Sequence, residues 1–242
     1  SGIFLDEGKL APDYVPDDIM YRENEIKEIA FCLQGIVNGK RGEHAIVTGP
    51  PGTGKTTCAR HVISQLKEHS KKAIPVYVNC WEFSSKFSVL SEVACKLGEI
   101  LPRRGIALDE IMDRVIQSAR REKAGIVVVL DEADKLEDLD FLYMMLEEIE
   151  RKAIVIIANY REWIAELDER INSRLMPEII EFKPYNHEET KGILKQRMDY
   201  AFQPNVWDND AFELIAKKTA EMQDIRTGLY LMKQAGLLGD PA

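Results

Sequence analysis

The chain has 242 residues, of which 45% are hydrophobic and 30% charged, an ordinary globular composition that can bury a substantial core. Its formal net charge of −9 excludes an overall basic field that would draw the protein to nucleic acid or acidic membranes, so any DNA contact must be local. No apolar run is long enough to span a membrane and the first residues lack a signal-peptide pattern, so we expect an intracellular protein without a membrane partner. The cysteines lack metal-binding spacing, and free buried thiols are expected at Cys32, Cys58, Cys80 and Cys95.

The first residues of the chain are expected to be irregular, because Pro12 and Pro16 interrupt them. A helix is predicted from Tyr21 onward, since apolar residues recur at helical spacing at Ile26, Ile29, Ala30 and Leu33. The turn-forming residues Asn38, Gly39 and Gly42 are expected to end this helix.

Residues 45–57, Ala-Ile-Val-Thr-Gly-Pro-Pro-Gly-Thr-Gly-Lys-Thr-Thr, have the pattern of a phosphate-binding loop. An apolar strand leads into Gly-x-x-x-x-Gly-Lys-Thr and a helical pattern follows, which is the context that this motif requires. The glycines let backbone N–H groups close around a phosphate, and the helix adds its positive N-terminal end. Lys55 is expected to reach the β- and γ-phosphates, and the Thr56 hydroxyl to complete a Mg²⁺ shell. The predicted nucleotide contacts of the loop are Pro51, Gly52, Thr53, Gly54, Lys55, Thr56 and Thr57.

Strands and helices are predicted to alternate after this loop. The predicted strands cover 73–78, 125–130, 153–158 and 179–182, and the predicted helices cover 84–101, 109–121 and 139–149. Pro102 and Gly105 are expected to end the first of these helices. The run at 125–130 is continuously apolar, as expected of a strand buried on both faces of a parallel sheet. The pattern predicts an α/β fold with a parallel sheet sandwiched between helices.

From Asn186 onward the pattern changes to helices alone. Three helical segments are predicted at 187–202, 209–220 and 226–238, with no strand between them. We therefore place a domain boundary near Pro184. The prediction is a nucleotide-binding α/β domain over residues 1–185 and a small all-α lid domain over residues 186–242.

Polar side chains follow two of the predicted strands directly. Asp131 and Glu132 end the 125–130 strand, and open α/β sheets place ligand groups at this edge. Asp131 is predicted to bind Mg²⁺ and Glu132 to orient or polarise the attacking water. Asn159 ends the 153–158 strand in the same way, so it is predicted to hydrogen-bond the γ-phosphate or the water.

Phosphoryl transfer builds negative charge on the equatorial oxygens, so an arginine is expected to assist it. The candidates are Arg170, Arg174 and Arg226. Arg174 lies just before the last strand and far in sequence from the loop, which suits a residue offered to a neighbouring subunit. Arg226 begins the final helix and could fold over the nucleotide from the second domain.

Together these motifs resemble the AAA+ ATPases. The resemblance rests on the loop, the Val-Val-Leu-Asp-Glu-Ala-Asp run at 128–134, Asn159 as sensor 1, Arg174 as arginine finger and Arg226 as sensor 2. Further stretches are similar to the origin-recognition and cell-division-control initiator branch, particularly its archaeal members. These stretches are 12–18 with 21–26, 78–80, 86–105, 130–136 and 182–185.

The resemblance implies Mg²⁺-dependent ATP hydrolysis that is slow in the monomer, with ATP or ADP and Mg²⁺ as cofactors. It implies that Val15, Pro16 and Arg22 contact the nucleotide on its adenine side, and that residues 81–106 form an initiator-specific insertion. The chain departs from the branch at residues 223–226, where Gln-Asp-Ile-Arg replaces the usual Gly-Asp-Ala-Arg. The family's DNA-binding winged-helix domain is expected beyond the lid, and two alternatives stay open: a trimmed ATPase module or a protein without that domain.

Two functions remain open at this point. The first is the ATPase switch of a replication initiator, with origin double-stranded DNA and a replicative helicase or other replication proteins as partners, acting in the nucleoid-bearing cytoplasm or in a eukaryotic nucleus. DNA would meet the segment from Lys86 to Arg104, which could equally be a solvated amphipathic helix. The second is a stand-alone or clamp-loader-like ATPase that acts on a protein partner. The acidic charge favours the second function, and the spacing of several separate motifs favours the first.

Overall fold

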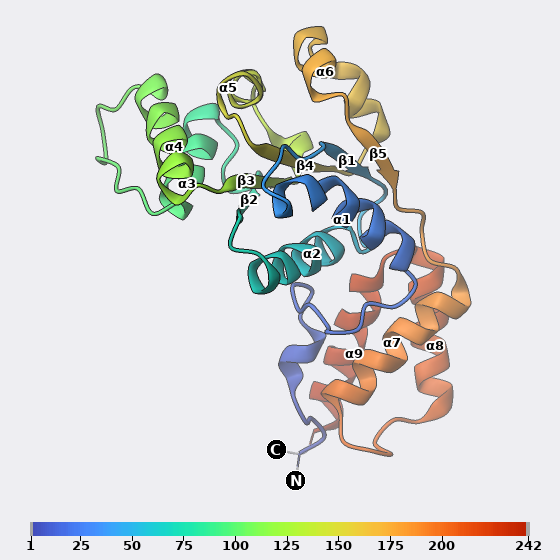
Figure 1. The fold of residues 1–242 in the computed structure, drawn as a ribbon. Helices are drawn as coiled ribbons and strands as arrows, with labels where there is room; N and C mark the ends of the chain where they lie inside the picture. The colour runs from blue at the N-terminus through green and yellow to red at the C-terminus, as the bar shows by residue number, and fades with distance from the viewer. Residues whose placement is uncertain (1, 241–242) are drawn as a thin grey trace. The chain divides into compact units, whose positions relative to one another are not determined.

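Five parallel strands form one sheet in the computed structural model of the chain, which describes residues 2–240. The strand order is β2-β3-β4-β1-β5 (Figure 1). The strands are β1 (Ala45–Thr48), β2 (Ala73–Asn79), β3 (Gly125–Asp131), β4 (Lys152–Ala158) and β5 (Glu178–Glu181). Every residue of β3 is buried, as its continuous apolar run predicts for a strand covered on both faces. The α/β fold class predicted from the alternating pattern is confirmed.

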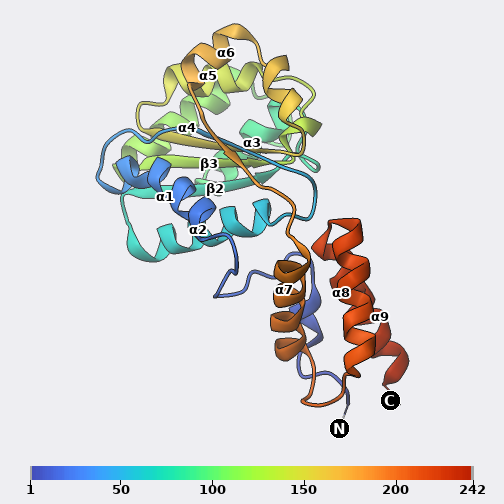
Figure 2. The same ribbon diagram turned by 90° about the vertical axis from the view of Figure 1, so that its right-hand side faces the viewer.

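Helices cover both faces of this sheet (Figures 1 and 2). On one face lie α1 (Glu23–Val37) and α2 (Lys55–His69). On the other face lie α3 (Lys86–Lys96), α4 (Leu108–Glu122), α5 (Asp140–Glu148) and the short α6 (Glu169–Leu175). Three short 3₁₀ segments complete the pattern: η1 (Glu7–Leu10), η2 (Ala133–Lys135) and η3 (Arg161–Glu166). Within residues 2–240, no helix combines the length and the apolar character needed to cross a bilayer.

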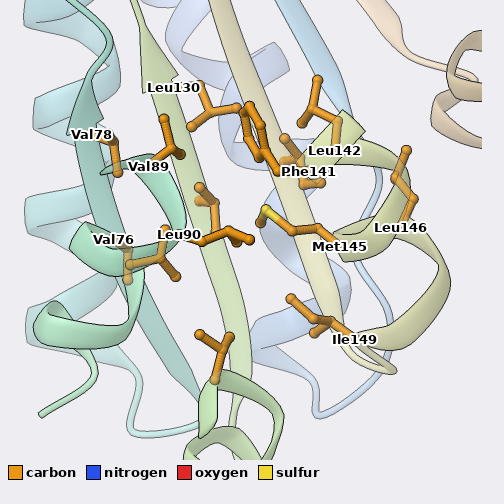
Figure 3. Packing of buried hydrophobic residues seen from close by; sticks show 14 of the residues in the cluster. Val76, Val78, Val89, Leu90, Leu130, Phe141, Leu142, Met145, Leu146 and Ile149 are labelled. Atoms are coloured by element: carbon orange, nitrogen blue, oxygen red, sulfur yellow. The ribbon is translucent and has the colours of Figure 1, made fainter. Parts of the chain in front are cut away.

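The larger apolar core lies between the sheet and the helices α3 to α6 (Figure 3). Phe141 and Leu142 of α5, Leu90 of α3 and Leu130 of β3 all belong to this core, and all four side chains are buried. Burying each such side chain contributes roughly 1.5–3 kcal/mol. This packing fixes β3, and therefore the polar residues at its end.

The helix predicted over 84–101 is wrong in its last part, because α3 ends at Lys96. Gly98 has φ +89°, which glycine adopts without strain. The Gly98 N–H donates to the Cys95 carbonyl and the Glu99 N–H to the Ala94 carbonyl, both at 3.0 Å, which is a Schellman ending. The chain therefore leaves the helix before Pro102 and Gly105, and the segment up to α4 is a loop. Helix α6 was not predicted, because it is too short to show a helical period.

The three helices predicted after residue 186 are confirmed as α7 (His187–Ala201), α8 (Asn209–Met222) and α9 (Ile225–Gly239). Each begins with a side-chain cap, from Asn186, Asp208 and Asp224 respectively. Their second apolar core includes Leu194, Phe212, Leu229 and Met232, and Leu10 of the N-terminal segment joins it.

The chain forms two compact units, each made of separated stretches. One unit holds residues 24–49 and 58–181, with the sheet. The other holds residues 2–23, the loop at 50–57 and residues 182–240. Arg197 of α7 ties the N-terminal segment into the second unit, since its guanidinium donates to the carbonyls of Lys9 (2.9 Å) and Tyr14 (3.2 Å). The division into domains at residue 185 stays a prediction.

All four cysteines are free, and three of them are buried as predicted. Burial, with the neighbouring acidic charge, raises the pKa of Cys32 to about 11 and that of Cys80 to about 12, so both thiols stay protonated at neutral pH. The prediction of buried thiols is wrong for Cys95, which is exposed on α3. Its position on the solvent side of that helix follows from the burial of Val93 and Ala94 beside it.

His44 precedes β1 and accepts a hydrogen bond at Nδ1 from the Ile154 N–H of β4 (3.0 Å). Burial, with the charge of Lys152, lowers the pKa of His44 to about 4. Only the neutral ring can accept at Nδ1, so protonation of the folded protein breaks this contact. Folding therefore favours the neutral ring.

We expect the His44→Asn variant to lose a pH dependence of stability. The histidine of the unfolded chain titrates near pH 6.5, so the neutral His44 ring contributes fully to the free energy of unfolding above about that pH. This contribution, up to about 3 kcal/mol, is lost as the pH falls toward 4. Asn keeps an acceptor close to the Nδ1 position but does not titrate. Urea unfolding at pH 7, 5.5 and 4.5 should show a free energy that falls less steeply in the variant. Equal slopes for both proteins would contradict this account.

Candidate nucleotide-binding site

The glycine loop leaves the carboxyl end of β1 and continues into α2, as its motif predicts. Gly52 and Gly54 have φ values of +76° and +91°, which side-chain-bearing residues rarely adopt. A Cβ atom on Gly52 would lie 1.9 Å from Asp224 Oδ1, and one on Gly54 would lie 2.6 Å from the Tyr185 hydroxyl. Both positions therefore require glycine, for backbone conformation and for space.

Two side chains close the loop on itself. Lys55 Nζ donates to the Pro50 carbonyl at 2.7 Å, and Thr53 Oγ1 donates to the same oxygen at 2.8 Å. Both side chains are buried, with Lys55 6% exposed. Pro51 is exposed at the loop, and Thr56 and Thr57 lie partly buried in the first turn of α2. An ammonium held across a ring of backbone suits an anionic ligand with several oxygens.

Arg22 braces the loop. Its Nε and Nη2 donate to the Thr53 carbonyl at 3.1 and 2.9 Å, and Nη2 also donates to the Lys183 carbonyl. The guanidinium lies 4.1 Å from the centroid of the Tyr185 ring and is 5% exposed. The contacts thus show Arg22 supporting the loop backbone, which the sequence did not indicate. Its predicted contact with the nucleotide remains a prediction.

The other predicted adenine-side residues lie in the N-terminal segment. Pro16 is buried and Val15 is partly buried. Gln196 of α7 holds the same segment through a hydrogen bond to the Asp18 carbonyl (3.0 Å), beside the Arg197 contacts. The segment is therefore fixed within its unit, and the nucleotide role of Val15 and Pro16 stays a prediction.

Asp131 ends β3 with a carboxylate that is almost fully buried. Its Oδ1 accepts from the Glu132 N–H (2.8 Å), and its Oδ2 accepts from the Tyr77 hydroxyl of β2. Burial and the charge of Asp131 raise the pKa of Tyr77, so this hydroxyl remains a donor. The Arg60 guanidinium lies 4.4 Å from the centroid of the Tyr77 ring. Tyr77 was not foreseen, because only the pairing of β2 with β3 brings it to Asp131. Arg60 was not foreseen either, since it reaches the Tyr77 ring from α2.

The structure brings two predicted catalytic side chains together. Asn159 Nδ2, just after β4, donates to Glu132 Oε2 at 2.9 Å. Glu132 has φ +55°, a left-handed conformation that costs on the order of 1 kcal/mol for a residue with a side chain. This backbone turn aims the carboxylate toward the end of the neighbouring strand. Catalytic roles for Glu132 and Asn159 stay predictions.

The predicted metal ligands are an aspartate and a threonine, Asp131 and Thr56. Within residues 2–240, no group of three or more His, Cys, Asp and Glu side chains could hold a metal ion on its own. Mg²⁺ typically takes one or two protein oxygens and completes its octahedron with phosphate oxygens and water. Binding of Mg²⁺ by Asp131 and Thr56 therefore stays a prediction.

Arg174 lies on α6 and contacts the Glu147 carboxylate of α5 through Nε. Its guanidinium also lies 4.8 Å from the centroid of the Tyr143 ring, and the bond to Glu147 raises its pKa. In the part of the chain that the structure describes, Arg174 therefore binds Glu147 and not the Glu132–Asn159 pair. Arg170 pairs with Asp168 instead. A role of Arg174 in a neighbouring subunit stays a prediction.

Arg226 lies in the first turn of α9 and forms a two-point ion pair with Asp224. Its Nε donates to Asp224 Oδ1 at 3.0 Å and its Nη2 to Oδ2 at 2.6 Å. Burial acts to raise the pKa of Asp224, but the bonds and charge of Arg226, with the charge of Lys55, hold it below its usual range. Gln223, which stands where the initiator branch commonly has glycine, has φ +54° and so keeps a glycine-like backbone.

The fold and the site together define an AAA+ P-loop NTPase. Its features are a parallel five-stranded sheet, a glycine loop after β1, carboxylates after β3, an asparagine after β4 and a helical lid. Residues 39–163 match the AAA domain family, and residues 191–241 match the Cdc6 AAA+ ATPase-type lid domain. The chain belongs to the AAA domain family and carries a lid of the Cdc6 type.

Its curated relatives include archaeal ORC1-type DNA replication proteins. ORC1-type DNA replication protein 2 of Methanosarcina acetivorans is 30% identical over 97% of this chain and 65% of the relative. The protein of the same description from Thermoplasma acidophilum is 34% identical over 93% of this chain and 58% of the relative. The chain thus spans less than two thirds of the length of either relative.

A solved structure of the Aeropyrum pernix ORC1 protein in complex with DNA is also similar. It superimposes with a TM-score of 0.90 at 31% identity, covering 98% of this chain and 65% of that protein. The AAA+ fold and the initiator-type relationship predicted from the motifs are therefore confirmed.

Proposed function

We propose that the chain is the Mg²⁺-dependent ATP-binding and hydrolysing switch of a DNA replication initiator. The observation that carries the proposal is the set of polar groups at one edge of the sheet. Since β1, β4 and β3 are parallel neighbours, the glycine loop departs from the edge at which Asp131, Glu132 and Asn159 lie. Ligand sites of open α/β sheets form at this edge.

Each residue has a distinct role in this proposal. The loop N–H groups and Lys55 bind the phosphates, and Asp131 with Thr56 holds Mg²⁺, which would neutralise developing charge on the phosphates. Glu132 orients the attacking water and accepts its proton, and the Asn159 hydrogen bond fixes the direction of that carboxylate. Arg226 balances charge from the lid, and Arg174 does so from a neighbouring copy, so that the isolated subunit turns over slowly.

The test is a pair of variants that separates binding from turnover. Glu132→Gln keeps the shape and the Asn159 contact but cannot accept a proton, so ATP affinity should stay within about threefold while turnover falls at least about 100-fold. Lys55→Ala should lose ATP binding in a calorimetric titration. Lys67→Ala, an exposed lysine on the same helix, is the matched control and should change neither property. Turnover at the wild-type rate in Glu132→Gln would place water activation elsewhere.

A role of Arg174 in trans predicts complementation between inactive subunits. Arg174→Ala should lower turnover only at concentrations where subunits associate. A mixture of Arg174→Ala with Glu132→Gln should recover activity that neither variant has alone, because the first supplies an intact Glu132 and the second an intact arginine. The control is Arg170→Ala on the same helix, which should turn over ATP at the wild-type rate without being mixed with a second variant. A loss that does not depend on concentration, without recovery in the mixture, would assign Arg174 a role within its own subunit.

DNA is proposed to bind the segment 81–106, although the chain as a whole has a net charge of −9. Arg103 and Arg104 are exposed in the loop between α3 and α4. Trp81 is 68% exposed, and Lys135 Nζ lies 5.0 Å from the centroid of its ring. An aromatic ring beside cationic groups suits contacts with a phosphate backbone and sugars. A replicative helicase or other replication proteins are the protein partners that this function implies.

Removing both loop arginines should weaken binding to duplex DNA and flatten its salt dependence. If Arg103 and Arg104 each neutralise one phosphate, the double alanine variant should reduce the slope of log K against log salt by about 2. Lys217→Ala with Lys218→Ala removes two exposed charges from α8 and serves as the control of equal charge. Fluorescence anisotropy titrations of duplex DNA, at salt concentrations from about 50 to about 200 mM, give the slope for each double variant. Equal slopes for the two double variants would remove this segment from the DNA interface.

A further inference from the structure

Asp224 is a carboxylate within the unit that carries the phosphate-binding loop. Its Oδ1 atom lies 1.9 Å from the position that a Cβ on Gly52 would take, so the carboxylate fills the space beside this glycine. The next residue adds a backbone contact, since the Ile225 N–H points to the Gly52 carbonyl at 3.4 Å. The start of α9 is therefore attached to the loop at Gly52.

The same carboxylate engages cations that the proposed function assigns to phosphate. Arg226 binds both of its oxygens, and the Arg226 backbone N–H donates to Oδ1 at 3.0 Å. Lys55 adds attraction from the loop itself. A nucleotide brings several negative charges to this region, and like charges at short distance repel. Arg226 cannot keep a two-point bond to Asp224 and also offer the same donors to a phosphate.

We infer that Asp224 is an affinity-determining residue that competes with nucleotide phosphate for Arg226. The inference rests on the proposed nucleotide site. Binding of ATP or ADP replaces the Asp224 carboxylate by a phosphate as the partner of Arg226. The cost of breaking the Asp224 ion pair therefore offsets part of the binding free energy that Arg226 contributes. Nucleotide affinity is lower than the loop alone would give, and the first turn of α9 responds to the ligand.

An N-terminal cap of α9 is the simpler role of Asp224, and it can be separated from the competition. Asp224 Oδ1 caps the helix by accepting from the Arg226 N–H. Asparagine and serine cap helices about as well as aspartate but carry no charge. Asp208 caps α8 in the same manner, by accepting from the Ala211 N–H at 3.0 Å. Asp208→Asn therefore repeats the chemical change at a second cap that is not beside Gly52.

The experiment is a calorimetric titration of ATP into the wild type, Asp224→Asn and Asp208→Asn in the presence of Mg²⁺. Asp224→Asn should bind ATP about 3- to 10-fold more tightly, the size of a partly exposed charge interaction, and Asp208→Asn should match the wild type. Asp224→Ser gives the same reading if the asparagine variant does not fold. In an Arg226→Ala background, the gain from Asp224→Asn should fall by at least half.

The other outcomes are equally decisive. Equal or weaker ATP binding by Asp224→Asn, with a wild type that binds ATP, overturns the competition and leaves the proposed function standing. A gain that is undiminished in the Arg226→Ala background also overturns it, since the charge would then act without the arginine. If neither the wild type nor Asp224→Asn binds ATP, the proposed function fails and this inference fails with it. Binding by the variant alone supports both.

Discussion

All strands of the sheet run in one direction, and the arrangement of the catalytic candidates depends on this pairing. The register pairs Asn79 of β2 with Asp131 of β3, and Leu130 of β3 with Ile156 of β4. Chain segments far apart in sequence therefore end at one edge, where Tyr77 reaches Asp131 and Asn159 reaches Glu132. The apolar layer beneath α3 and α5 holds the register, because a slip of one residue would exchange the side chains of β3 between the two packed faces of the sheet.

Backbone motifs were readable from the sequence because their chemistry is local. The glycine loop depends on two residues with left-handed backbone and on the helix that follows, all within 45–57. The strands and helices were also predictable from local sequence, because buried strands have continuous apolar runs and helices have apolar residues at helical spacing. The end of α3 was misplaced because apolar spacing continues to Ile100, although that side chain is 88% exposed and Gly98 had already turned the chain away.

The supporting residues of the site could not be read in this way, since their partners are distant in sequence. Arg22 supports a carbonyl 31 residues away, and Tyr77 donates to a carboxylate 54 residues away. Tyr77 belongs to no recognised motif, and the stretch 21–26 that contains Arg22 gives no local sign that this arginine holds the Thr53 carbonyl. Asp224 stood inside a recognised stretch, but its position beside Gly52 depends on how α9 begins. Local sequence thus indicates the candidate catalytic residues, whereas tertiary contacts determine which residues position them.

The cysteines differ sharply in accessibility, and this has a practical consequence. Cys32, Cys58 and Cys80 are buried, whereas Cys95 faces solvent on α3, within the segment proposed to meet DNA. A maleimide dye reacts with the accessible thiol in preference to buried ones. This stretch of chain thus carries an attachment point for a fluorophore. Such a label on α3 would sense the surroundings of this segment without any engineered residue.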